Sequence, residues 1–170
     1  MKNIVLILIF SIILSIYAKS QVDKSYGTHG FYIGNQVSIQ SLNNSGYKYE
    51  ITSGKIPEDE SQKLKNNSLT IIIDDTEDIQ INIDYDKNIN SISHGFKRSN
   101  PKTMELIKDD FQLRYGEPSS VTSDKASRLI KWDCERDSEK IEIIIIAFAS
   151  TFNNKVTQWS IITTYSKCPN

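Results

Sequence analysis

Short isoleucine-rich runs, separated by short polar segments, constrain the fold of this chain more than any other feature. Residues 79–86 (IQINIDYD) alternate cleanly, which places Ile79, Ile81, Ile83 and Tyr85 on one face of a strand. Most neighbouring runs are joined by only a few residues, too few for a parallel crossover, so the pattern predicts an antiparallel meander. Further strands are predicted at 69–75, 89–96, 127–134, 139–150 and 156–166.

One helix is predicted to begin after Asn100, which can cap it, with Pro101 in its first position and Gly116 at its end. A second helix is indicated at 35–46, where Gly46 forms the stop. The apolar stripe of the first helix consists of Met104, Ile107, Phe111 and Tyr115.

The two histidines of the chain both occur in the tripeptide His-Gly-Phe, at 29–31 and 94–96. Each copy precedes a predicted helix, and three strands are expected after each helix. We therefore expect a tandem β-α-β-β-β repeat with halves at about 22–86 and 89–166. Two such units give an α+β fold, a curved antiparallel sheet of about eight strands with two helices on one face.

The second half contains LIKDDFQLRYGEPSSV, followed by RLIKWDC, IEIIIIAF and QWSIITTY. A helix ending in Tyr-Gly-x-Pro thus precedes a strand with a central Trp and two further strands. With the tandem order, this resembles exported α+β proteins of the β-lactamase inhibitor protein type. The resemblance implies the fold and supplies no binding residue.

The first 20 residues have the pattern of a secretory signal peptide. Lys2 precedes an apolar run at 4–17, and Ala18 and Ser20 occupy the −3 and −1 positions of a cleavage site. The run is shorter than the roughly 20 residues that span a bilayer, which favours cleavage over a membrane anchor. We expect an exported protein, periplasmic or secreted, with a single domain at 21–170 and no membrane attachment after cleavage.

Two cysteines in an exported chain predict one disulfide, Cys134–Cys168, with two thiols as the alternative. In a meander, strands 127–134 and 156–166 run parallel on either side of 139–150. Their ends then lie at the same edge of the sheet, and the tail after 166 is expected to curl across the middle strand.

The sequence gives little indication of metal or enzyme chemistry. His29 and His94 form either a metal or acid–base pair or the structural ends of strands, and the absence of H-x-x-x-H or C-x-x-C favours the structural role. A calcium loop starting at Asp84 fails because Ile89 and Gly95 occupy the positions that need Gly and Glu. No cofactor is expected, and two helices on one face give no obvious cleft. The net charge of −1 gives no basic surface for nucleic acid.

Strand 139–150 is apolar on both faces, since Ile141, Ile143 and Ile145 alternate with a second apolar set. Either the long polar segment 53–68, expected to be a mobile excursion, covers that second set, or the set forms an exposed interface. The predicted interface has an apolar centre of Ile144, Ile146, Phe148 and Ile162 and a polar rim of Lys131, Asp133, Glu142 and Gln158.

These features favour a non-enzymatic module that binds another protein, as an enzyme inhibitor or a toxin-immunity protein does. An envelope assembly or structural accessory protein is the first alternative. A small hydrolase or a carbohydrate-binding protein is the second.

Overall fold

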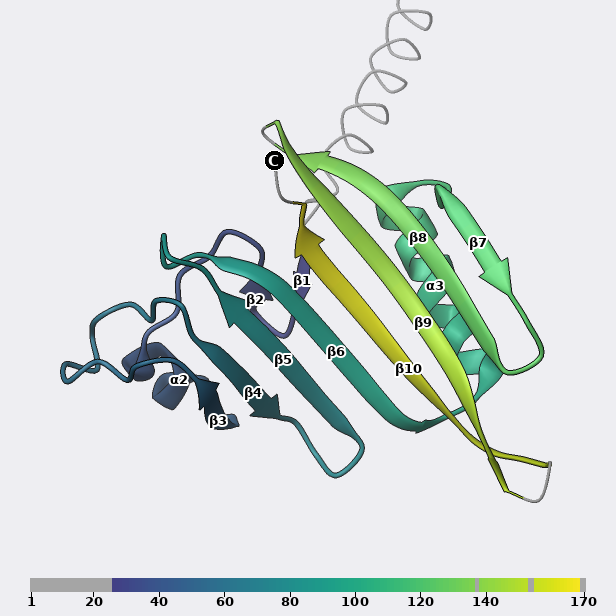
Figure 1. Cartoon of the computed structure of the whole chain (residues 1–170), viewed down its shortest axis with the longest axis horizontal. Helices are drawn as coiled ribbons and strands as arrows, with labels where there is room; N and C mark the ends of the chain where they lie inside the picture. The colour runs from purple at the N-terminus through teal and green to yellow at the C-terminus, as the bar shows by residue number, and fades with distance from the viewer. Residues whose placement is uncertain (1–25, 137, 153–154, 169–170) are drawn as a thin grey trace, which may run out of the picture.

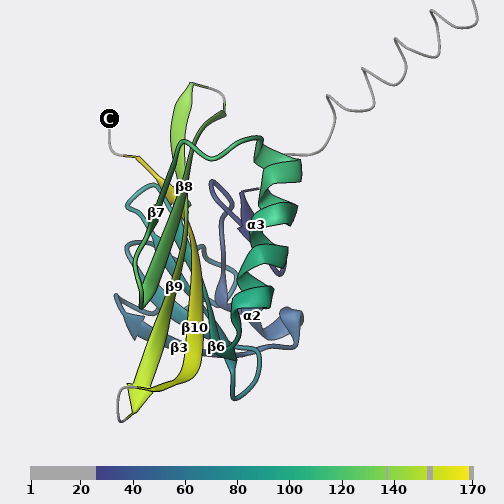
Figure 2. The same ribbon diagram turned by 90° about the vertical axis from the view of Figure 1, so that its right-hand side faces the viewer.

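The computed structural model describes residues 26–136, 138–152 and 155–168, so the predicted signal peptide at 1–20 lies outside the described residues. An eight-stranded antiparallel sheet forms the body of the protein (Figure 1). Within the described residues there are two helices, and both lie on the same face of the sheet (Figure 2). The predicted α+β class is therefore confirmed.

The helices are α2 (Ile39–Ser45) and α3 (Pro101–Tyr115). A separate two-stranded hairpin consists of β1 (Gly27–Thr28) and β2 (Phe31–Tyr32). The large sheet has the order β3-β4-β5-β6-β10-β9-β8-β7. Its strands are β3 (Lys48–Ser53), β4 (Ser68–Ile72), β5 (Glu77–Ile83), β6 (Ile89–Ser99), β7 (Ser120–Ser123), β8 (Ser127–Arg136), β9 (Glu139–Phe152) and β10 (Lys155–Lys167).

The predicted β-α-β-β-β repeat is not confirmed. Four strands follow each helix, β3 to β6 after α2 and β7 to β10 after α3. The sequence missed β7 because all of its residues are exposed, so it carries no apolar alternation. The two His-Gly-Phe copies also differ in place, since 29–31 spans a hairpin turn and 94–96 lies inside β6.

Local capping sets both helix starts. At α3, the Asn100 side chain accepts a hydrogen bond from the Thr103 backbone N–H at 3.0 Å, as expected for an N-cap. Helix α2 begins later than predicted, because Ser38 and Ser41 form a reciprocal capping box. Gly46 ends α2 in the left-handed conformation, with φ of 78°.

The core lies between the sheet and the helices. Ile79, Ile81 and Ile83 are buried there, as predicted, but Tyr85 is 70% exposed. The prediction for Tyr85 was wrong because β5 ends at Ile83 and the chain then turns. The Lys65 ammonium lies 5.3 Å from the centroid of the exposed Tyr85 ring.

Segment 53–68 packs against α2 instead of extending away from the fold. The Leu64 side chain is fully buried, and its backbone N–H donates to the Val37 carbonyl at 2.7 Å. The buried Asn67 amide donates to the carbonyls of Ser53 and Lys55. These contacts hold the segment beside α2, at the β3 edge of the sheet (Figure 1).

The expected disulfide is not formed, so that prediction was wrong for this structure. Cys134 and Lys167 both pair with Ile141, from opposite sides of β9. Two strand spacings, about 9.6 Å, therefore separate β8 from β10 at this level, beyond the reach of a disulfide. The tail does not curl across β9. The Cys168 N–H donates to the Lys140 carbonyl, so the chain continues alongside β9.

Substitution of two neighbouring isoleucines of β9 tests whether only one face of the sheet is core. Ile143 is fully buried between Trp132 and Tyr165, whereas Ile144 lies on the opposite face. We expect Ile143→Ala to lower the free energy of unfolding by about 2–5 kcal/mol, and Ile144→Ala to lower it by less than about 2 kcal/mol. Urea denaturation of both variants measures this difference. Equal losses would show that both faces of β9 are core.

Candidate functional site

The apolar residues predicted for an interface alternate with the buried residues of β9 and β10, so they lie together on the opposite face of the sheet, the one that carries no helix (Figure 2). In the register of the sheet, Ile146 lies directly between Leu129 of β8 and Ile162 of β10. Ile144 and Phe148 flank Ile146 on the same face of β9, and Phe148 is 39% exposed. We call these five residues the outer apolar patch.

The predicted polar residues of the rim lie at the two ends of this patch. The Lys131 ammonium lies 2.5 Å from a Glu142 carboxylate oxygen and 3.1 Å from an Asp133 oxygen. The hydrogen bonds that Lys131 donates to Glu142 and then to Asp133 raise the pKa of Lys131, and the hydrogen bonds that Asp133 accepts from Ser119 and then from Lys131 lower the pKa of Asp133. At the other end of the patch, Gln158 pairs with Ser150. The structure thus brings all eight predicted interface residues to one face.

No described segment covers the patch. The segment that we considered as a cover, 53–68, packs with α2 at the far edge of the sheet, and α2 and α3 lie on the other face (Figures 1 and 2). Segment 53–68 therefore does not cover the apolar residues of β9, and the described residues leave that face open.

The helix-covered face contains a second group of polar residues, and here the two histidines meet. His29 lies in the turn of the β1–β2 hairpin, which rests on this face between α2 and α3 (Figure 1). His94 lies inside β6, opposite Ile79 and Thr163. Their ring centroids are 5.0 Å apart.

Glu77 of β5 completes this cluster. One of its carboxylate oxygens lies 2.6 Å from Nε2 of His94 and 3.6 Å from Nε2 of His29. On the other side of the rings, the Thr28 hydroxyl oxygen lies 2.8 Å from Nδ1 of His29 and 3.4 Å from Nδ1 of His94. We call these four residues the His–Glu cluster.

Burial determines the charge of the inner histidine. His94 is 5% exposed, and desolvation lowers its pKa below the ordinary value even though the hydrogen bond and charge of Glu77 act to raise it. Burial therefore favours the neutral form of the His94 ring. A neutral imidazole can donate one ring N–H to Glu77 and keeps a lone pair on the other nitrogen.

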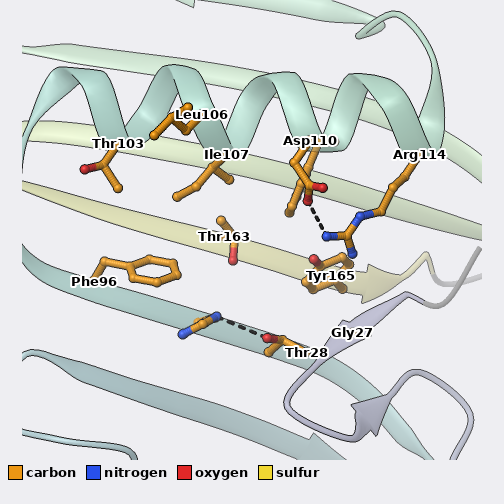
Figure 3. A pocket seen from close by; sticks show the side chains of 12 residues that line it. Gly27, Thr28, Phe96, Thr103, Leu106, Ile107, Asp110, Arg114, Thr163 and Tyr165 are labelled. Carbon is orange, nitrogen blue, oxygen red and sulfur yellow. Dashed lines mark hydrogen bonds and ion pairs between the residues drawn. The ribbon is translucent and has the colours of Figure 1, made fainter.

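A cavity of about 300 Å³ lies beside the cluster, between α3 and the strands β6 and β10. Figure 3 shows Thr163 on its sheet side and the Asp110–Arg114 ion pair on its helix side. Thr28 and His94 belong to both the cluster and the cavity lining. The expectation that this layer arrangement leaves no cleft therefore does not hold.

Sequence reasoning missed the partners of the histidines. The signal for Glu77 was present, because it continues the buried series of Ile79, Ile81 and Ile83 by two residues and so points to the same face. Thr28 gave no comparable signal, because β1 and β2 have only two residues each.

No family model matches the chain, and no curated protein or solved structure matches it. The resemblance to proteins of the β-lactamase inhibitor protein type therefore stays a prediction. None of the described helices is long and apolar enough to cross a membrane.

The charge balance in the cluster can be tested by nuclear magnetic resonance. Since Glu77 acts to raise the pKa of His94, we expect Glu77→Gln to lower that pKa further below its ordinary value. A pH titration of the imidazole signals measures it, and His29→Asn assigns the two signals because the chain has two histidines. A rise in the pKa of His94 in Glu77→Gln would contradict this account.

Proposed function

We propose that this protein is an exported, non-enzymatic module that binds another protein on the open face of its sheet, as an inhibitor or a toxin-immunity protein does. The observation that carries the proposal is the outer apolar patch on β8, β9 and β10, which has a charged rim and no described cover.

The two halves of the open face differ, and this difference supports a specific surface. An antiparallel sheet with one solvated face normally presents polar side chains there. The β3–β5 half follows this rule apart from Ile72, with Thr70, Gln80 and Asn82 on the open face. In the β8–β10 half, the open face instead carries a row of three apolar residues, Leu129, Ile146 and Ile162. A contiguous apolar centre confined to one half of a mostly polar face is typical of a binding surface.

The composition of the patch also fits a protein partner. Binding energy in protein interfaces is concentrated in a few central, well-packed side chains, and aromatic residues are enriched among them. Phe148 supplies such an aromatic group, and Ile146 lies at the centre of the apolar row. The ion pairs of Lys131 lie at the rim, where charges favour orientation and choice of partner more than affinity.

Substitution at the centre of the patch tests this function. We expect Ile146→Lys to weaken binding of the partner by at least about 30-fold, because a hot-spot residue contributes about 2 kcal/mol or more. The partner is isolated from the periplasm or medium of the native host, purified, and titrated against both proteins by calorimetry.

Ile72→Lys is the matched control. Ile72 is 42% exposed and lies on the same open face, but in β4, outside the patch. It should bind the partner like the natural protein. If Ile146→Lys is folded and binds equally well, or if the purified protein turns over a substrate in a broad hydrolase panel, the proposal is wrong. If Ile146→Lys unfolds, the strand is core on both faces and the site lies elsewhere.

We also propose that the two halves arose by duplication. The support is the shared order of one helix followed by four consecutive strands, with the halves joined at β6 and β10. In this arrangement the outer apolar patch belongs to the second half alone.

A further inference from the structure

Three metal-ligating side chains converge on the helix-covered face, away from the outer apolar patch. His29, Glu77 and His94 each offer one ligand atom, and these atoms all lie within 4.8 Å of one another. We propose that they bind a divalent transition-metal ion of the zinc type, with a fourth position filled by an exchangeable ligand such as water. This inference is independent of the proposed protein-binding function.

The donor set identifies the class of metal. Two imidazole nitrogens and one carboxylate oxygen are a set that zinc uses in sites that keep a fourth position open. Magnesium and calcium prefer sites built from oxygen alone. His29 is the most exposed of the three side chains, at 29%, so water has access to the open position.

The distances fit such an ion after small side-chain movements. A tetrahedral zinc ion with ligands at about 2.0–2.2 Å holds the ligand atoms about 3.3–3.5 Å apart. The shared Glu77 oxygen is 3.6 Å from Nε2 of His29, already near this value. It is 2.6 Å from Nε2 of His94, a hydrogen bond that must open by less than about 1 Å when the metal replaces the proton. The proton that leaves Nε2 is taken up on Nδ1 of the same ring, which therefore stays a neutral imidazole.

Thr28 supplies the support that metal-binding histidines usually have. Its hydroxyl oxygen lies near Nδ1 of both rings, at 2.8 Å from His29 and 3.4 Å from His94. A hydroxyl oxygen has two lone pairs, so it can accept an N–H from each ring. When a metal is bound and each ring carries its proton on Nδ1, both Nε2 atoms are free of protons and directed to the side of Glu77.

The backbone at His29 gives an independent reason to look for a function. His29 and Gly30 both have positive φ, 52° and 84°, as a two-residue hairpin turn requires. Asn or Asp is the common residue before Gly in such a turn. A histidine held at positive φ in that position is a backbone outlier that points to a functional role. Here the turn places the imidazole beside Glu77, and the Tyr47 ring contacts it edge-on at 6.2 Å between centroids.

Burial prepares the second ligand. The His94 ring packs against Phe96, with centroids 4.1 Å apart, and is buried in the sheet. The strand and this packing hold the ring in place beside Glu77 before any metal binds.

The test uses the purified protein without a histidine tag, with Co²⁺ as a visible probe and Zn²⁺ as its competitor. We expect one Co²⁺ per chain, seen as visible absorption that Zn²⁺ abolishes. Zn²⁺ should also raise the melting temperature, whereas Mg²⁺ and Ca²⁺ should not. Since the chain has two histidines, imidazole coordination has no other origin in this protein.

Two variants separate the proposed site from a purely structural cluster. His29→Asn should stay folded, because Asn tolerates positive φ, and should lose at least 100-fold in Co²⁺ affinity. Thr28→Val keeps the shape and the three ligands but removes the hydroxyl, so we expect a 10- to 100-fold loss. Glu77→Gln should also lose the site.

Replacing both cysteines by serine is the matched control, because thiols also bind zinc. That variant should bind Co²⁺ as tightly as the natural protein. The proposal is overturned if the natural protein binds no Co²⁺ at micromolar concentration, if folded His29→Asn binds equally well, or if the cysteine variant loses binding.

Discussion

The antiparallel pairing of β6 with β10 joins residues that lie about 70 positions apart in the chain, and both sites depend on it. In its register Thr163 lies opposite His94, and Ile162 lies opposite Gly95. The side chains of the first pair point to the helices and line the cavity, while Ile162 of the second pair belongs to the outer apolar patch on the open face. A shift of one residue would exchange the two faces of β10 and remove both sites at once.

Strand β9 explains why the open face can be apolar without becoming core. Both neighbours pair with β9 over ten or more residues, so its backbone is satisfied on both sides. Ile141, Ile143 and Ile145 supply the buried face. Because the buried face already holds β9 in place, folding depends less on the side chains of its open face. They are available for binding, which is the physical basis of the proposed function.

How far the sequence predicts this protein depends on the range of the interactions. Ile79, Ile81 and Ile83 were placed correctly because alternation within one strand is a local signal. Asn100 and Gly116 marked the ends of α3 for the same reason. The disulfide prediction failed because it required the path of a chain end, which the hydrogen bond from Cys168 to Lys140 sets instead. The meeting of the two histidines depends on how a short hairpin rests on the sheet, and the sequence contains no periodic signal for that contact.

The glycine of the shared His-Gly-Phe tripeptide is required for a different physical reason in each copy. The tripeptide is therefore weak evidence of duplication. At 29–31 the glycine is needed for the turn, since Gly30 has φ of 84°. At 94–96 the glycine lies within a strand, where a Cβ would come within 3.1 Å of an Asp78 carboxylate oxygen. That carboxylate pairs with Lys97 at 2.7 Å on the open face, while His94 and Phe96 point to the helices. Identical residues thus meet different demands. Any duplication must be argued from the order of helices and strands, whereas the two histidines are linked by their contact in the folded protein.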